Sequence, residues 1–361
     1  MSRLDQFRQL MAVEKIDGFL ITQPENRRYL SGFTGSAGVL VITADRQVVA
    51  TDSRYYEQVH QQCPDWELAE VGYNFAANML ELLRSLGLGA RHVGFEAEHI
   101  NVATLHTWER ALLGRLILVH TEGFAEQLRM RKDDDEMARI KKAVALADAA
   151  FAHLTTVIRP GLTERQVAWE LESYMRTHGA EAVSFAPIVA SGPNGALPHA
   201  QPTDRPLQKG EPVVMDFGCT VDGYCSDITR TICLGEPAND QYLAVWHTVR
   251  RAQTAVFQGA KAAMTGVEVD KLARDVIYAA GYTLEHFGHG LGHSLGLAVH
   301  ENPRYGFSYP HAVPERAVMT VEPGIYIPGW GGVRLEDVVV AHENGLEILT
   351  SAPKEPILPL K

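Results

Sequence analysis

Apolar and polar positions follow two kinds of pattern along the chain, helical spacing and short apolar runs, and these patterns predict where helices and strands lie. Residues 3–14 have the spacing of a helix, and short apolar runs at 18–22 and 38–42 then alternate with helical segments up to about residue 119. Strands mixed with helices in this way predict an α/β domain at the amino terminus.

Two stretches of this first region, 26–33 and 51–56, are rich in polar and aromatic residues. One interpretation is a helix start and a strand end with surface side chains, because such positions are often polar. The alternative is a lid or a subunit contact. Both interpretations stay open at this point.

The pattern changes near residue 129, where a dense run of charges at 129–136 precedes a long helical segment. Acidic residues in a first turn suit the helix dipole, so this run is interpreted as a solvated helix start. We place a domain boundary there, which gives predicted domains 1–128 and 129–361.

The second domain contains a weak internal repeat in which two helices adjoin strands. The predicted helices run over about 134–158, from the capping box Thr163-x-x-Gln166 to Gly179, over about 239–264, and from about 270 to Gly281. Predicted strands cover 183–190, 213–218 and segments around Thr320 and Val338. Two similar αα plus β halves that share one sheet face predict an α+β domain with pseudo-twofold repeats and a site at the seam.

Residues 211–235 predict a β-hairpin with Asp222-Gly223 as its two-residue turn. This turn places Asp227 opposite Gly218, with Asp216 diagonal to it on the same face. Two carboxylates that close repel each other, so either one is protonated or a cation lies between them.

A second hairpin is predicted around the turn at 328–332. Its symmetry brings Glu322 together with Glu336, and Arg334 shares a strand face with Glu336. Surface pairing is the plain alternative for such glutamates. Both lie among apolar strand residues, however, where an unpaired charge is costly.

Four histidines lie in the glycine-rich segment 286–300, and His199 lies in a separate short loop. Each glycine costs about 1 kcal/mol in a helix interior, so the segment is predicted to be loop or strand. A single histidine is as often structural as functional. Several histidines in one glycine-rich segment favour a site.

Composition excludes some classes of partner. The 361 residues carry a net charge of −11 and contain no basic run, which argues against a nucleic-acid or anionic-membrane surface. The amino terminus has no apolar signal-peptide core and no stretch is long enough to span a bilayer, so a cytoplasmic protein is expected. The four cysteines show no metal-type spacing and are expected to be reduced packing residues.

The four carboxylates of the two predicted hairpins indicate a site for divalent metal ions. Four carboxylates that share a buried pocket need about four positive charges, which two divalent ions supply. Oxygen ligands with one nitrogen favour Mn²⁺ or a similar ion, and two such ions about 3.5 to 4 Å apart can hold a bridging hydroxide.

The motifs resemble the metallopeptidase family of the pita-bread fold, which contains aminopeptidase P, prolidase and methionine aminopeptidase. The resemblance covers 129–361 and is carried by Asp216-x10-Asp227, His289-x3-His293-x6-His300, the turn at 320–324 and Arg334-x-Glu336. The amino-terminal half is similar to the creatinase-type, RNase H-like domain of aminopeptidase P and prolidase, which methionine aminopeptidases lack.

The resemblance implies a role for each candidate residue. The implied metal ligands are Asp216, Asp227, His293, Glu322 and Glu336, with Asp227 and Glu336 bridging two ions. Glu322 would also shuttle a proton, and Arg334 would orient Glu336. The implied substrate-binding residues are His199, His289 and His300, of which His289 or His300 would stabilise the oxyanion. Arg304 is the candidate clamp for a substrate carboxylate, with a surface role as the alternative.

The function implied is an Xaa-Pro aminopeptidase that uses a bridging hydroxide on two divalent ions, with Mn²⁺ favoured over Co²⁺ or Zn²⁺. An Xaa-Pro dipeptidase (prolidase) is the alternative. A creatinase-like amidinohydrolase or a non-enzymatic peptide-binding relative is disfavoured, because none of the implied ligands is substituted. Proline-containing peptides are the expected partners, and a homodimer is the expected assembly.

Overall fold

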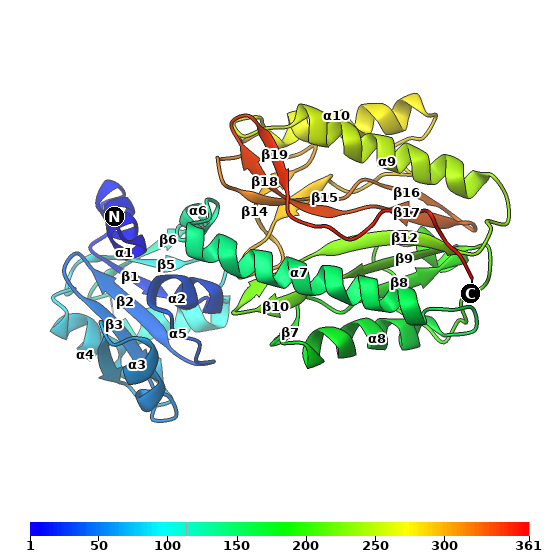
Figure 1. Cartoon of the computed structure of the whole chain (residues 1–361). Helices are drawn as coiled ribbons and strands as arrows, with labels where there is room; N and C mark the ends of the chain where they lie inside the picture. Colours follow the sequence, from blue (N-terminus) through cyan, green and yellow to red (C-terminus); the bar gives the residue numbers. More distant parts are fainter. Residues whose placement is uncertain (113, 361) are drawn as a thin grey trace. The chain divides into compact units, whose positions relative to one another are not determined.

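The computed structural model describes residues 1–112 and 114–360, and the chain forms two compact units, Met1–Arg129 and Met130–Lys361 (Figure 1). Among the described residues, no helix has the length and apolar character needed to cross a membrane.

The first unit is built around a six-stranded sheet of order β4-β3-β2-β1-β5-β6, in which β1 runs parallel to β5 and antiparallel to β2. The strands are β1 Gly18–Ile21, β2 Val39–Thr43, β3 Gln47–Thr51, β4 Glu67–Glu70, β5 His92–Glu96 and β6 Ile117–Thr121. The helices are α1 Arg3–Val13, α2 Pro24–Ser31, α3 Tyr56–Gln62, α4 Phe75–Ser85, α5 Val102–Leu112 and α6 Glu126–Arg129. The expected α/β class is therefore observed.

Polar residues of the first unit are more buried than the surface interpretation predicts. Asn26, Arg27 and Asp52 are each less than 5 % exposed. Asn26 Nδ2 donates to Glu96 Oε1 at 2.7 Å, and Glu96 Oε2 accepts from the N–H of Thr22 at 2.6 Å. The strand end at Thr51 is as expected, but residues 26–33 cover the body and the end of α2 and not a helix start. The buried network joins α2 and the residue after β1 to β5, and it corrects the expectation of a surface side chain at Asn26.

Four long helices enclose the strands of the second unit: α7 Asp134–Val157, α8 Glu164–Thr177, α9 Gln241–Gly259 and α10 Gly266–Ala279. In Figure 1, α7 and α8 lie on one side of these strands and α9 and α10 on the other. Capping boxes begin α7, α8 and α10, and the box of α8 is the expected Thr163 and Gln166 pair.

Two helix boundaries differ from prediction by four residues or more. The helix α9 ends at Gly259, five residues early, because Ala262 N–H donates to His342 and Ala263 N–H donates to Val313 instead of continuing the helix. The helix α10 begins four residues early, because Thr265 and Glu268 form a capping box.

The charge run before α7 is only partly solvated. Asp134 and Asp135 are exposed, but Lys132 and Glu136 are buried. Lys132 Nζ lies 3.1 Å from Glu301 Oε2 and 3.3 Å from Ser294 Oγ. The expected solvated helix start is therefore present at Asp134 and Asp135, but another part of the run makes a buried ion pair.

The described strands of the second unit form four sheets, of orders β11-β10-β7, β20-β12-β9-β8, β14-β13-β15-β18-β19 and β16-β17. The strands of the first half are β7 Ala182–Val183, β8 Ile188–Ser191, β9 Pro212–Phe217, β10 Cys219–Val221, β11 Tyr224–Cys225 and β12 Ile228–Leu234. The remaining strands are β13 Gly292–Ser294, β14 Glu301–Tyr305, β15 Val318–Val321, β16 Gly324–Ile327, β17 Gly331–Arg334, β18 Asp337–His342, β19 Gly345–Ile348 and β20 Ile357–Leu358. The strand expected at 183–190 is thus two short strands in different sheets.

Each helix pair has its own hydrophobic core. Residues of α7 and α8 pack against β8, β9 and β12, whereas α9 and α10 pack against β15, β16, β17 and β18. The four cysteines are buried and form no disulfide within the described residues. The two predicted αα plus β halves are present, and β12 lies at the seam between them, where Glu336 N–H donates to the carbonyl of Thr229 at 3.0 Å.

Candidate functional site

The two aspartates of the first half lie on one hairpin. Asp222 and Gly223 have positive φ of 49° and 79°, as the predicted two-residue turn requires. The observed pairs are Val221 with Tyr224, Thr220 with Cys225, Phe217 with Ile228, and Asp216 with Thr229. This confirms the predicted register. Asp216 in β9 and Asp227 just before β12 consequently reach one cavity.

The two glutamates lie between paired segments of the second hairpin. The observed pairs are Val321 with Asp337, Gly324 with Arg334, and Ile325 with Val333, which confirms the predicted symmetry. Glu322 N–H donates to the carbonyl of Leu291 at 2.8 Å, and Glu336 N–H donates to Thr229. These two backbone bonds tie the hairpin to the glycine-rich segment and to the first half.

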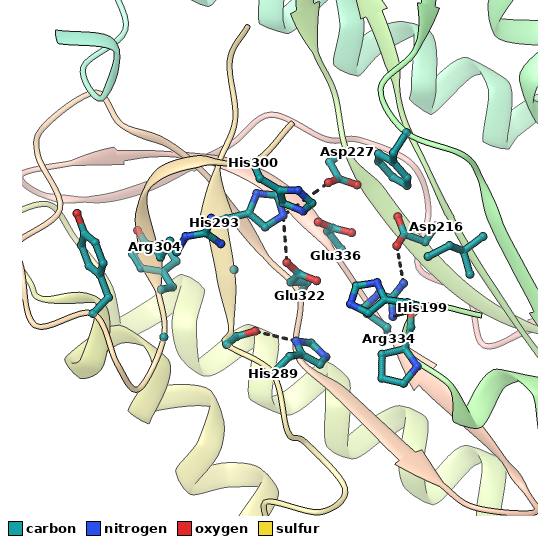
Figure 2. A pocket seen from close by; sticks show the side chains of 18 of the residues that line it. His199, Asp216, Asp227, His289, His293, His300, Arg304, Glu322, Arg334 and Glu336 are labelled. Carbon is teal, nitrogen blue, oxygen red and sulfur yellow. Dashed lines mark hydrogen bonds and ion pairs between the residues drawn. The ribbon is translucent and has the colours of Figure 1, made fainter. Parts of the chain in front are cut away.

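A cluster of carboxylates and one imidazole lies at the centre of the cavity. Asp227, His293 and Glu336 each offer a ligand atom within 4.8 Å of the others. His293 Nε2 is also 3.4 Å from Glu322 Oε1. Figure 2 shows these side chains and Asp216 directed into the same space, so the structure brings together all five residues implied as ligands.

The cluster fits divalent cations on two grounds. Asp216 Oδ1, Asp227 Oδ1 and Glu336 Oε1 are buried and have no hydrogen-bond partner within the described part of the chain. Burial and then the neighbouring carboxylates raise the pKa of Asp227 and of Glu336, and burial raises the pKa of Glu322 to about 8. Cations supply ligation for the orphaned oxygens and remove the repulsion.

The His293 ring favours the neutral form and is held in one orientation. Burial and the neighbouring His300 lower the pKa of His293 to about 3. Its Nδ1 lies 3.2 Å from the carbonyl of Ser294, a contact that fixes the ring with Nε2 toward the carboxylates. A second hydrogen bond of this kind commonly orients metal-ligating histidines.

Arg334 has a different partner from the one expected. Its guanidinium forms an ion pair with Asp216, and it contacts Glu336 only indirectly. Arg334 Nε donates to Thr229 Oγ1 at 3.0 Å, and that hydroxyl donates to Glu336 Oε2 at 2.6 Å. Arg334 is the last residue of β17, whereas Glu336 lies in the break between β17 and β18, so the expected shared strand face does not produce a direct bond.

The remaining histidines differ in how they are held. His289 Nε2 lies 3.0 Å from the Tyr326 hydroxyl and Nδ1 lies 2.8 Å from the carbonyl of Gly290, so protein contacts engage both nitrogens. Burial and Arg334 lower the pKa of His289 to about 4. His199 and His300 are exposed at the cavity wall, and within the described residues the His300 ring makes no hydrogen bond.

The cavity has a volume of about 550 Å³, and its lining includes both apolar and cationic side chains. Phe185, Ile188 and Phe307 supply apolar surface, and Arg304 supplies a cation. The Arg304 guanidinium is exposed and forms no hydrogen bond or ion pair with the described residues. This combination suits a small ligand that has both an apolar group and an anionic group.

Two residues of the site were missed at the sequence level. Thr229 lies directly opposite Asp216 in the register that the hairpin predicted, so its polar side chain in an apolar strand was a usable signal. Tyr326 accepts from Arg334 Nη1 at 2.8 Å and contacts His289. No sequence spacing links Tyr326 to His289, because Tyr326 lies in β16 and His289 lies in the loop before β13.

Comparison with known proteins agrees with this geometry. Residues 138–343 match the model of metallopeptidase family M24, and residues 3–131 match the creatinase/prolidase N-terminal domain. An uncharacterized peptidase of Bacillus subtilis is 41% identical over 356 residues, covering 99% of both chains. These matches confirm the expected two-part fold class.

Two solved structures are similar over nearly the whole chain. An Xaa-Pro dipeptidase from Bacillus anthracis superposes with a TM-score of 0.94 at 40% identity and covers 99% of both chains. An X-Pro aminopeptidase from Thermotoga maritima superposes with a TM-score of 0.89 at 39% identity, covering 99% of this chain and 100% of that one. The relatives therefore divide between the two peptidase types.

Proposed function

The chain belongs to metallopeptidase family M24, and on this premise we propose that it is a metal-dependent aminopeptidase that cleaves the bond between an N-terminal residue and proline. The observation that carries the proposal is the buried cluster of Asp227, His293 and Glu336, whose orphaned oxygens open into a cavity with apolar and cationic walls. An Xaa-Pro dipeptidase is the second candidate, because the unpaired Arg304 suits a free carboxylate.

We propose that two divalent ions are held by Asp216, Asp227, His293, Glu322 and Glu336. Oxygen-rich donors favour Mn²⁺, with Co²⁺ or Zn²⁺ as alternatives. When bound, such ions lower the pKa of water and polarise a carbonyl group. Metal analysis of purified protein should find about two ions per chain, and a protein that binds none after Mn²⁺ is supplied contradicts the proposal.

The chain's own residues would handle the proton and the developing charge. Glu322, whose Oε1 lies 3.4 Å from His293 Nε2 in the carboxylate cluster, is placed to accept a proton and to deliver it to the proline nitrogen as that group leaves. The free ring of His300 would donate to the oxyanion. His289 is held on both nitrogens, so we assign it, with His199, to the substrate-binding wall.

The decisive experiment compares an Xaa-Pro dipeptide with an Xaa-Pro-Xaa tripeptide under Mn²⁺, with an Xaa-Ala-Xaa tripeptide as control. Release of the first residue from the tripeptide supports the aminopeptidase. Cleavage of the dipeptide alone moves the assignment to the dipeptidase. Cleavage of neither proline peptide refutes both.

Arg304 gives a second way to separate the two activities. If its guanidinium binds the carboxylate next to proline, Arg304→Met should raise KM for the dipeptide at least tenfold, since a charge-assisted pair is lost. KM for a long Xaa-Pro peptide should change little.

The family resemblance also supports a homodimer, which sedimentation of the full chain measures.

A further inference from the structure

A buried ion pair on α10 lies behind the cavity wall. Arg274 Nε donates to Asp270 Oδ2 at 2.7 Å and Nη2 donates to Asp270 Oδ1 at 2.9 Å, one helical turn apart. Asp270 is 1 % exposed and Arg274 is 8 % exposed. Neither residue is among those that line the cavity. The pair therefore acts on the cavity only through what it contacts.

Arg274 contacts two segments that do line the cavity. Its Nη1 donates to the carbonyl of Phe287 at 2.7 Å, and Nη2 donates to the carbonyl of His289 at 2.9 Å. The guanidinium also faces the rings of Phe287 at 4.3 Å and Phe307 at 5.1 Å. One side chain thus holds the backbone that carries His289 and the ring of Phe307 on the opposite segment.

Asp270 extends the same arrangement toward the carboxylate cluster. Its Oδ1 also accepts the N–H of Leu291 at 3.0 Å. The carbonyl of Leu291 in turn accepts the N–H of Glu322 at 2.8 Å. Two consecutive hydrogen bonds therefore connect Asp270 to the backbone of the residue to which we assign the proton transfer.

We propose that Asp270 and Arg274 are positioning residues with separate tasks. Arg274 sets the substrate-binding wall formed by His289 and Phe307, and Asp270 sets Glu322 through Leu291. The kinetic part of this inference rests on the proposed function. The structural part, that the pair orders the segment 287–291, does not.

The first test is the kinetics of Arg274→Lys and Asp270→Ala on an Xaa-Pro peptide that the wild type cleaves. Lysine keeps the positive charge but lacks the guanidinium that donates to the carbonyls of Phe287 and His289. Asp270 still accepts the N–H of Leu291 in this variant. We expect KM to rise about tenfold with kcat within about twofold. Asp270→Ala also loses the Leu291 contact and should lower kcat about tenfold or more.

The matched control is Lys271→Met, which removes an exposed ion pair with Asp275 at the same i,i+4 spacing on the same helix. It should leave KM, kcat and metal content at the wild-type values. A wild-type KM in Arg274→Lys overturns the proposal, as does an equal KM rise in Lys271→Met. Arg274→Lys carries the decision if Asp270→Ala does not fold.

Amide hydrogen exchange provides a readout that does not need activity. Arg274→Lys should accelerate exchange in 287–291 by about tenfold or more, and Lys271→Met should not. Unchanged exchange in Arg274→Lys overturns the proposal whatever the substrate is. If the wild type cleaves no proline peptide, the proposed function fails, and the exchange result still decides the positioning role.

Discussion

The two halves of the second unit share an architecture of two helices and a hairpin but supply different groups to the seam. The first half contributes Asp216 and Asp227 from its hairpin. The second contributes Glu322 and Glu336 from the equivalent hairpin and adds His293 from its glycine-rich segment. A repeated fold thus fixes where side chains emerge, whereas the residues at those positions fix the chemistry.

Carboxylates of each half have hydrogen-bond or ion-pair partners in the other half. Arg334 of the second half pairs with Asp216 of the first, and Thr229 of the first donates to Glu336 of the second. A further crossing pair, Arg230 with Asp337 at 2.8 Å, is buried away from the cavity. Of these two crossing ion pairs, Arg334 with Asp216 lies at the site and Arg230 with Asp337 lies outside it, so the two should respond differently to mutation.

The largest expected effect is at Glu322 in the second half. Glu322→Gln keeps the size of the side chain but cannot accept and return a proton, so kcat should fall by about 10² to 10⁴-fold. Turnover at saturating Mn²⁺ measures this. Glu347→Gln, an exposed glutamate on β19, is the control and should keep wild-type kcat. Wild-type turnover in Glu322→Gln would show that its assigned role is wrong.

The next effect separates the two crossing ion pairs. Arg230 is 1 % exposed, and Arg230→Met leaves Asp337 buried with only part of its partners, so the free energy of unfolding should fall by about 3–5 kcal/mol. Arg334→Met should instead affect activity more than stability, because Asp216 faces the cavity. Urea denaturation and kcat/KM, measured on both variants, test this. Equal losses of stability and activity in both variants would contradict the distinction.

The sequence predicted the two hairpins because their registers depend on local signals. Asp222-Gly223 admits one two-residue turn, and every pair out to Asp216 with Thr229 follows from it. The start of α10 was predictable in the same way, since Thr265-x-x-Glu268 is a capping box in the sequence.

Contacts between segments distant in sequence were not predictable. Arg334 is 118 residues from Asp216, and Lys132 is 169 residues from Glu301. The carboxylate that pairs with each cation depends on how the two halves pack together and on the path of the chain just before α7. Local charge pattern therefore assigned Lys132 to solvent, although its side chain is buried.

A smaller effect tests the hydroxyl that joins the halves. Thr229→Val removes the donor to Glu336 and the acceptor for Arg334 at nearly constant volume, so metal affinity should fall about 10 to 100-fold. Thr231→Val on the same strand is the matched control, since the Thr231 hydroxyl bonds only the backbone of Arg334. Metal titration of both variants makes the comparison. Equal metal affinities in the two variants would show that the Thr229 hydroxyl does not contribute to the metal site.

The smallest expected effect lies at the rim of the second half, where His342 ends β18. Hydrogen bonding to Glu315 and to Glu347 raises the pKa of His342. A raised pKa means that the stabilising contribution is complete below the unfolded value of about 6.5 and is lost as pH rises through the folded value. Because the side chain is 39 % exposed, the contribution should be only about 0.5 kcal/mol. His342→Gln should thus be less stable than wild type at pH 5.5 and equal to it at pH 9 in urea denaturation, and a difference that grows with pH would contradict the assignment.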